Sequence, residues 1–118
     1  MMRLFLLALS VLVIGACVEP RATDPIQRGK QVYREKSCGS CHRIGSDGST
    51  TGPELTHIGT VAETRKPDLD ADGYLIEAIR DPGAYVVPGY PDTMPRGLDR
   101  GMTQEDLDDL VLYLRSLR

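Results

Sequence analysis

The sequence predicts an all-α fold, and three observations support this prediction. Apolar residues recur at helical spacing in three segments, each with a recognisable start or stop signal. The segments between them are rich in glycine and proline, which is typical of loops. No stretch alternates convincingly between apolar and polar residues, as a half-buried strand would. We therefore expect three main helices joined by irregular loops.

The first helix is predicted from Pro25 to about Lys36, with Asp24 as its N-cap. A second helix is predicted from Gly73 to Arg80, where an Asp-Pro-Gly turn ends it. The third begins at Thr103, because Thr103 and Asp106 have the spacing of a capping box. Five apolar residues then recur on one side of it: Leu107, Leu110, Val111, Leu114 and Leu117. The remaining segments are expected to be loops.

The N-terminus has the pattern of an export signal. Arg3 precedes an apolar run from Leu4 to Ala16 that is too short to span a bilayer, so a signal peptide is predicted over residues 1–16. The following Ile14-Gly15-Ala16-Cys17 resembles a bacterial lipobox, which implies that Cys17 becomes the lipidated first residue. The alternative is an ordinary signal peptide cleaved after Ala16. With a lipid, the protein would be exported and anchored to the membrane, facing the periplasm or the cell exterior.

The rest of the chain is expected to form a flexible tether and one small domain. Residues 17–24 comprise the lipidated end and a polar, proline-containing tether, and residues 25–118 form the domain. The 118 residues carry 17 acidic and 14 basic side chains, a net charge of −3. This charge gives no support to nucleic-acid binding.

The motif Cys38-Gly39-Ser40-Cys41-His42 indicates a covalent haem site. Each thiol can add to a vinyl group of the porphyrin, and the adjacent imidazole can bind the iron. Three alternatives are weaker. A zinc site would need His57 as a distant fourth ligand and lacks a second close ligand pair. A thioredoxin-like pair lacks its βαβ context, and a disulfide would close a very small loop.

The candidates for a second iron ligand are Met94, Met102, His57 and the lysines. Met94 is favoured, because prolines on both sides of it stiffen a loop that must hold a thioether against iron. Met102 directly precedes the N-cap Thr103, where a residue more often packs as a hydrophobic staple.

Four motifs together resemble a class I monohaem c-type cytochrome. They are Cys38-x-x-Cys41-His42, Gly52-Pro53-x-Leu55, Val87-Pro88-Gly89-Tyr90-x-x-x-Met94-Pro95 and Tyr113-Leu114. The resemblance implies a small cytochrome c fold wrapped around one haem c attached to Cys38 and Cys41. His42 and Met94 would be the iron ligands. The Pro53 carbonyl would accept a hydrogen bond from His42, and Gly29 and Tyr33 of the first helix would meet the last helix near Tyr113.

This resemblance implies electron transfer rather than catalysis. We expect a one-electron carrier of a respiratory or photosynthetic chain, whose partners are membrane redox proteins, or a subunit of one such complex. The alternative is a haem enzyme or sensor for peroxide or a small gas, in which Met94 is displaced from the iron.

An acidic segment departs from the family pattern. Asp68 to Gly73 reproduces the first half of a calcium loop, but the twelfth position is Ile79 instead of a bidentate glutamate. Calcium binding is therefore possible but not favoured. We expect a solvated insertion in which Asp72 caps the helix that starts at Gly73.

Overall fold

A computed structural model describes residues 18–118, so the signal peptide predicted over residues 1–16 and the lipidation predicted at Cys17 lie outside the described residues. The described part contains four α-helices and one 3-10 turn: α1 (Pro25–Glu35), η1 (Cys38–Ser40), α2 (Ile58–Arg65), α3 (Ala71–Arg80) and α4 (Gln104–Ser116). Within residues 18–118 there is no strand beyond one isolated bridge. The all-α prediction is confirmed.

The caps predicted for the first and last helices are present. The Asp24 carboxylate accepts a hydrogen bond of 2.9 Å from the Gln27 N–H at the start of α1. At the start of α4, the Thr103 hydroxyl accepts from the Asp106 N–H, and the Asp106 carboxylate accepts from the Thr103 N–H. These hydrogen bonds satisfy backbone N–H groups that have no partner inside the helix.

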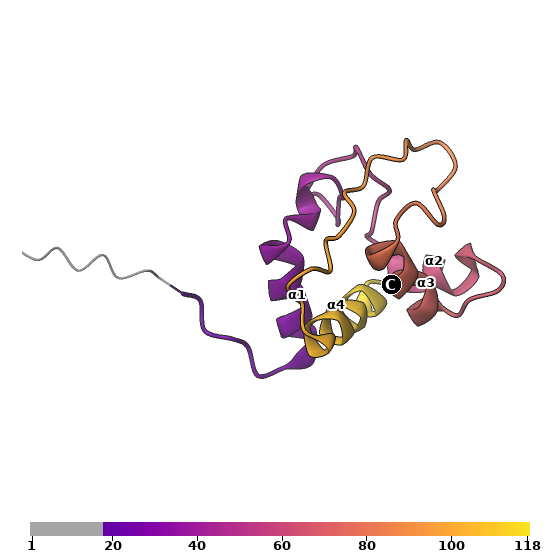
Figure 1. Cartoon of the computed structure of the whole chain (residues 1–118). Coiled ribbons are helices and arrows are strands. Elements are labelled where there is room, and N and C mark those ends of the chain that lie inside the picture. The colour runs from indigo at the N-terminus through magenta and orange to yellow at the C-terminus, as the bar shows by residue number, and fades with distance from the viewer. Residues whose placement is uncertain (1–17) are drawn as a thin grey trace, which may run out of the picture.

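Helices α1 and α4 cross in close contact (Figure 1). At the crossing, a Cβ on Gly29 would overlap the main-chain carbonyl of Asp109, so only glycine fits there. Beside Gly29, the rings of Tyr33 and Tyr113 meet edge to face, with 5.7 Å between their centroids. The close contact of Gly29, Tyr33 and Tyr113 that the family resemblance implies is therefore observed.

Two details of the helix prediction were wrong. Helix α2 was expected to be a loop; it forms against α3 and α4, and the Gly59 N–H donates to the Leu117 carbonyl at 2.7 Å. Helix α3 begins at Ala71 instead of Gly73, and its N-cap is Asp70 instead of Asp72. The Asp70 carboxylate accepts the Gly73 N–H at 2.7 Å, which occupies one oxygen of the acidic segment in helix capping.

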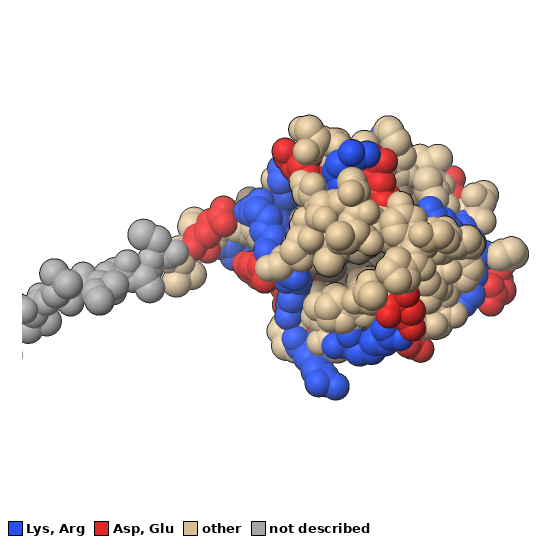
Figure 2. Space-filling view, turned by 90° about the horizontal axis from the view of Figure 1, so that it is seen from above, with Lys and Arg blue, Asp and Glu red and all other residues tan. Residues whose placement is uncertain are grey.

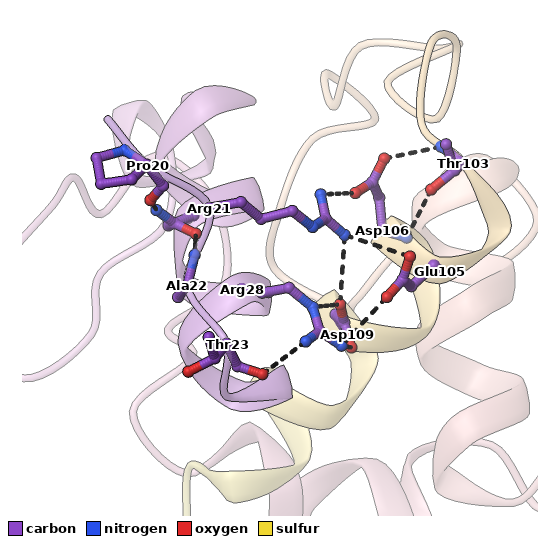
Figure 3. A network of polar contacts seen from close by, with 10 residues as sticks. Pro20, Arg21, Ala22, Thr23, Arg28, Thr103, Glu105, Asp106 and Asp109 are labelled. Carbon is purple, nitrogen blue, oxygen red and sulfur yellow. Dashed lines mark hydrogen bonds and ion pairs between the residues drawn. The ribbon is translucent and has the colours of Figure 1, made fainter. Parts of the chain in front are cut away.

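The segment before α1 lies against the helices. The sequence predicts a flexible tether here, but the side-chain amide of buried Gln31 donates to the Pro20 carbonyl and accepts from the Ala22 N–H. Arg21 reaches across to α4 and pairs with Asp106 at 2.8 Å (Figure 3). The tether is thus docked on α1 and α4 over these residues.

The loops that the helices carry gather at one end of the molecule, at the top of Figure 1. They are η1 with the segment that follows it, and the long segment between α3 and α4. Beneath them the helices bury an apolar core whose fully buried members include Leu107 and Leu110 of α4. Within residues 18–118, no helix combines the length and apolarity needed to cross a bilayer.

Candidate functional site

The Cys38–His42 motif begins directly after α1. The helix ends at Glu35, and Ser37 adopts a left-handed conformation with φ of 55°, which turns the chain away from the helix axis. The next residues form a tight turn in which the N–H groups of Cys41 and His42 both donate to the Cys38 carbonyl. Both cysteines are free, half-buried thiols on the wall of one cavity.

The His42 ring is fixed by the chain that follows it. Its Nδ1 lies 2.7 Å from the carbonyl oxygen of Pro53, an atom that can only accept a hydrogen bond. The proton is therefore on Nδ1, and Nε2 keeps its lone pair for a metal. Gly52 leaves room for the ring, because a Cβ at that position would lie 2.9 Å from His42 Cε1.

Met94 reaches the same cavity from the long segment between α3 and α4. It is half-buried, and the loop around it is braced by an ion pair of 2.7 Å between Asp92 and Arg96. Arg96 also donates to the Met94 carbonyl at 3.2 Å. The hydrogen bond from Arg96 lowers the pKa of the Asp92 carboxyl, so the ion pair persists at neutral pH.

The cavity has a volume of about 200 Å³ and a largely apolar wall. Aliphatic side chains come from several helices: Ile58, Leu75, Ile79, Leu110 and Leu114. Figure 2 looks onto the end where the loops gather and shows a hollow bordered largely by uncharged residues. Two thiols, one free imidazole nitrogen and one thioether on an apolar wall are the donor set of a covalently held haem, so these residues fit that group.

Comparison with known proteins gives the same result. The family model for cytochrome c matches residues 26–118, most of the chain. This chain belongs to the cytochrome c family. Membership implies a covalently bound haem c and electron transfer through it.

Three relatives of this cytochrome illustrate how its domain is used elsewhere. A cytochrome c oxidase subunit 2 of Alkalihalophilus pseudofirmus is 36% identical, over 89% of this chain and 29% of the relative. A cytochrome c-555 of Methylococcus capsulatus is 24% identical, over 76% of this chain and 86% of the relative. One subunit of a nitric oxide reductase of Stutzerimonas stutzeri is 25% identical, over 82% of this chain and 61% of the relative. The cytochrome therefore spans less than a third of the first relative and under two thirds of the third.

The other ligand candidates are either off the cavity wall or already engaged in a hydrogen bond. His57 is exposed at the start of α2 and is not on the cavity wall, so it does not join the cysteines as a zinc site would require. Met102 packs against the core next to Thr103. Lys36 lines the cavity, but its ammonium group donates to the Arg100 carbonyl at 2.9 Å. Met94 is thus the thioether that shares the cavity with His42 in the described part of the chain.

Three ionisable groups on the cavity wall are kept uncharged. Burial raises the pKa of Tyr33 to about 12 and also raises the pKa of the Tyr74 hydroxyl. The same effect raises the pKa of the Cys38 thiol. A wall that disfavours charge suits an apolar macrocycle.

Sequence reasoning did not place Arg65 at the site. Arg65, the last residue of α2, lines the cavity, and its Nη1 atom is buried without a hydrogen-bond partner. The sequence carries no signal for this placement, because the helix that delivers Arg65 was itself expected to be a loop.

Within residues 18–118, no group of three or more His, Cys, Asp or Glu side chains is arranged to hold a metal ion, and this includes the acidic segment from Asp68 to Gly73.

Proposed function

We propose that this cytochrome carries single electrons between redox proteins of a membrane electron-transfer chain. One haem c would be attached through Cys38 and Cys41, with His42 and Met94 as iron ligands. The observation that carries this proposal is the convergence of all four side chains on one cavity, although Met94 comes from a segment far along the chain. The haem supplies a centre that gains and loses one electron without bond cleavage.

The protein residues perform three tasks in this proposal. The Pro53 carbonyl fixes the ring and tautomer of His42 through its 2.7 Å hydrogen bond. The Asp92–Arg96 pair and the flanking prolines hold the Met94 loop, so little rearrangement would accompany a change of charge. The aliphatic wall would surround the haem with apolar side chains.

If His42 and Met94 both bound the iron, no iron position would remain for a substrate, so we propose a carrier rather than an enzyme. The names of two relatives, which are subunits of an oxidase and of a nitric oxide reductase, support redox partners of a respiratory complex or a place within one. A haem enzyme or sensor with a displaceable Met94 is the competing function. This competing function predicts that carbon monoxide changes the absorbance spectrum of the reduced protein. The spectrum of a carrier should stay the same.

The membrane location is proposed from the sequence pattern at the N-terminus. Ile14-Gly15-Ala16-Cys17 supports export and lipidation at Cys17, which would keep the domain near membrane complexes on the periplasmic or outer side. The anchor would raise the local concentration of the domain and leave docking weak and transient.

Intact mass spectrometry of protein extracted from membranes tests these proposals together. The expected mass is that of a chain starting at Cys17 with one haem and one lipid modification. A redox titration of the same sample should follow a single one-electron curve. A mass without haem would contradict the carrier function, and an unmodified Cys17 would contradict the anchor alone.

A further inference from the structure

The segment before α1, residues 18–24, folds back along that helix, and we call it the strap. Three side chains of α1, spaced three residues apart, hold the strap, and each binds an earlier strap residue than the one before it. The contacts, in order along the helix, are Arg28 with the Thr23 carbonyl at 2.8 Å (Figure 3), Gln31 with Ala22 and Pro20, and Arg34 with Glu19 at 3.2 Å. The strap therefore runs antiparallel to α1.

Gln31 is the central contact of the strap. Its side chain is only 9% exposed, and its amide bonds the chain on both sides of Arg21. The Nε2 atom donates to the Pro20 carbonyl at 2.9 Å, and the Oε1 atom accepts from the Ala22 N–H at 2.8 Å. Two hydrogen bonds at a nearly buried amide hold the strap more firmly than an exposed ion pair would.

The antiparallel course decides where the chain leaves the domain. Arg34 lies in the last turn of α1, and Lys36, two residues later, lines the haem cavity. The strap thus brings Glu19 beside residues 34–42, which we call the haem end of the domain. Val18, the next residue outward, is 83% exposed. The chain therefore leaves the domain at the haem end instead of at the start of α1.

We propose that the docked strap holds the haem end of the domain at the membrane surface. This inference rests on the proposed function, because it requires a haem in the cavity and a lipid on Cys17. With the strap docked, two residue steps separate Cys17 from Glu19, a reach of about 7 Å at roughly 3.5 Å per residue. A free strap would leave eight steps between Cys17 and Pro25, about 28 Å. The surface beside Val18 then faces the lipid bilayer, and a membrane-embedded redox protein is the partner that fits.

Trypsin tests whether the strap is docked, because Arg21 precedes Ala22 and cleavage between them frees the domain from Cys17. A protease needs an undocked segment, so the docked strap should protect this bond. In the full haem-loaded protein on phosphatidylcholine vesicles, Gln31→Leu loses both hydrogen bonds and should be cleaved there about tenfold faster than the wild type. Lys30→Gln, at the exposed neighbouring position of α1, is the matched control and should keep the wild-type rate. The mass of the released domain identifies the cut.

Quenching of a fluorescent lipid headgroup by the haem measures how close the haem lies to the same vesicles. Energy transfer falls steeply with distance, so the wild type and Lys30→Gln should quench more than Gln31→Leu. Ala22→Pro removes the N–H that donates to Gln31 and changes the strap alone, so it should also quench less than the wild type. If Gln31→Leu does not fold, the Ala22→Pro measurement decides.

The outcomes separate this inference from the function on which it rests. Wild-type protein without haem, or without a lipid on Cys17, would overturn the proposed carrier or its anchor, and this inference with it. Wild-type protein with both groups, but cleaved after Arg21 as fast as Gln31→Leu, would show an undocked strap and overturn this inference alone. A protected bond together with equal quenching by the wild type and both strap variants would also overturn the placement of the haem end.

Discussion

Arg28 of α1 holds the buried carboxylate of Asp109 on α4 through two hydrogen bonds, of 2.6 and 3.1 Å (Figure 3). Asp109 is only 3% exposed and lies on the face of α4 that packs against α1. The pair therefore joins the two helices whose crossing supports the haem motif at the end of α1. Arg21 and Glu105 extend it into a network of charges.

Replacing Arg28 should destabilise the fold more than replacing a surface arginine. Arg28→Met would leave the Asp109 carboxylate buried without the side chain that donates two hydrogen bonds to it. We therefore expect the melting temperature to fall by several degrees. Arg34→Met is the matched control on the same helix, since Arg34 pairs with Glu19 at 3.2 Å and both side chains are largely exposed. Equal melting temperatures for the two variants would show that the Arg28 pair contributes no more than a surface pair.

Gly29→Ala should separate α1 from α4. The added Cβ would overlap the main-chain carbonyl of Asp109, which cannot move like the end of a flexible side chain. We expect a loss of about 3 kcal/mol in unfolding free energy, despite the higher helix propensity of alanine. Denaturant unfolding measures it. Gly39→Ala is the control, because its Cβ would lie 3.7 Å from the Tyr33 ring, an ordinary contact. A Gly29 variant as stable as the wild type would show that the helices do not pack this closely.

Asp70→Ala should cost about 1 kcal/mol of stability, the usual value of an N-cap. Asp72→Ala should cost less, because Asp72 is exposed inside the first turn and pairs with Arg115 at 3.5 Å only. Calorimetric melting in chelator and in millimolar calcium should give the same temperature for each protein. A calcium-dependent rise in melting temperature that Asp70→Ala abolishes would instead identify an ion site.

Asp106 should stabilise the fold at neutral pH and lose this contribution in acid. The Thr103 N–H, and then Arg21, lower the pKa of its carboxyl in the folded state. A lowered folded-state pKa gives stability that is present above the unfolded-state pKa of about 4 and lost as the pH falls through the folded value. Asp106→Asn should therefore be less stable at pH 7 and lose less stability on acidification. Asp108→Asn, at an exposed position of the same helix, provides the comparison in pH-dependent unfolding.

The helix caps and the Cys38–His42 turn could be predicted from the sequence, because residues close together in the chain determine them. Asp24 and Thr103 cap their helices through bonds that span three residues, and Cys38–His42 forms one turn. Helix α2 depends on distant partners instead. Its short run of glycine and β-branched residues has no clear apolar face, and its Gly59 N–H is bonded to the far end of the chain.

The same distinction explains the errors at the site. Three aspartates at alternate positions can each cap a helix in principle, and only the extended backbone of Asp70 shows which one does. Arg65 acquires its place in the cavity from α2, so its position could not be predicted without that helix. Gln31 and Asp109 are polar residues buried by partners far away in sequence, which local patterns do not reveal.

Met94→Ala should change the iron ligation that we propose. Ferric wild-type protein should show the weak absorbance band near the red edge of the visible range that reports an iron–sulfur bond, and the variant should lack it. The midpoint potential should also fall, because a thioether stabilises ferrous iron. Met102→Ala is the matched control: Met102 packs against the core and is not on the cavity wall, so its variant should keep the band while losing some stability. If Met102→Ala removes the band and Met94→Ala keeps it, the ligand assignment is reversed; a band absent from the wild type would exclude a thioether ligand altogether.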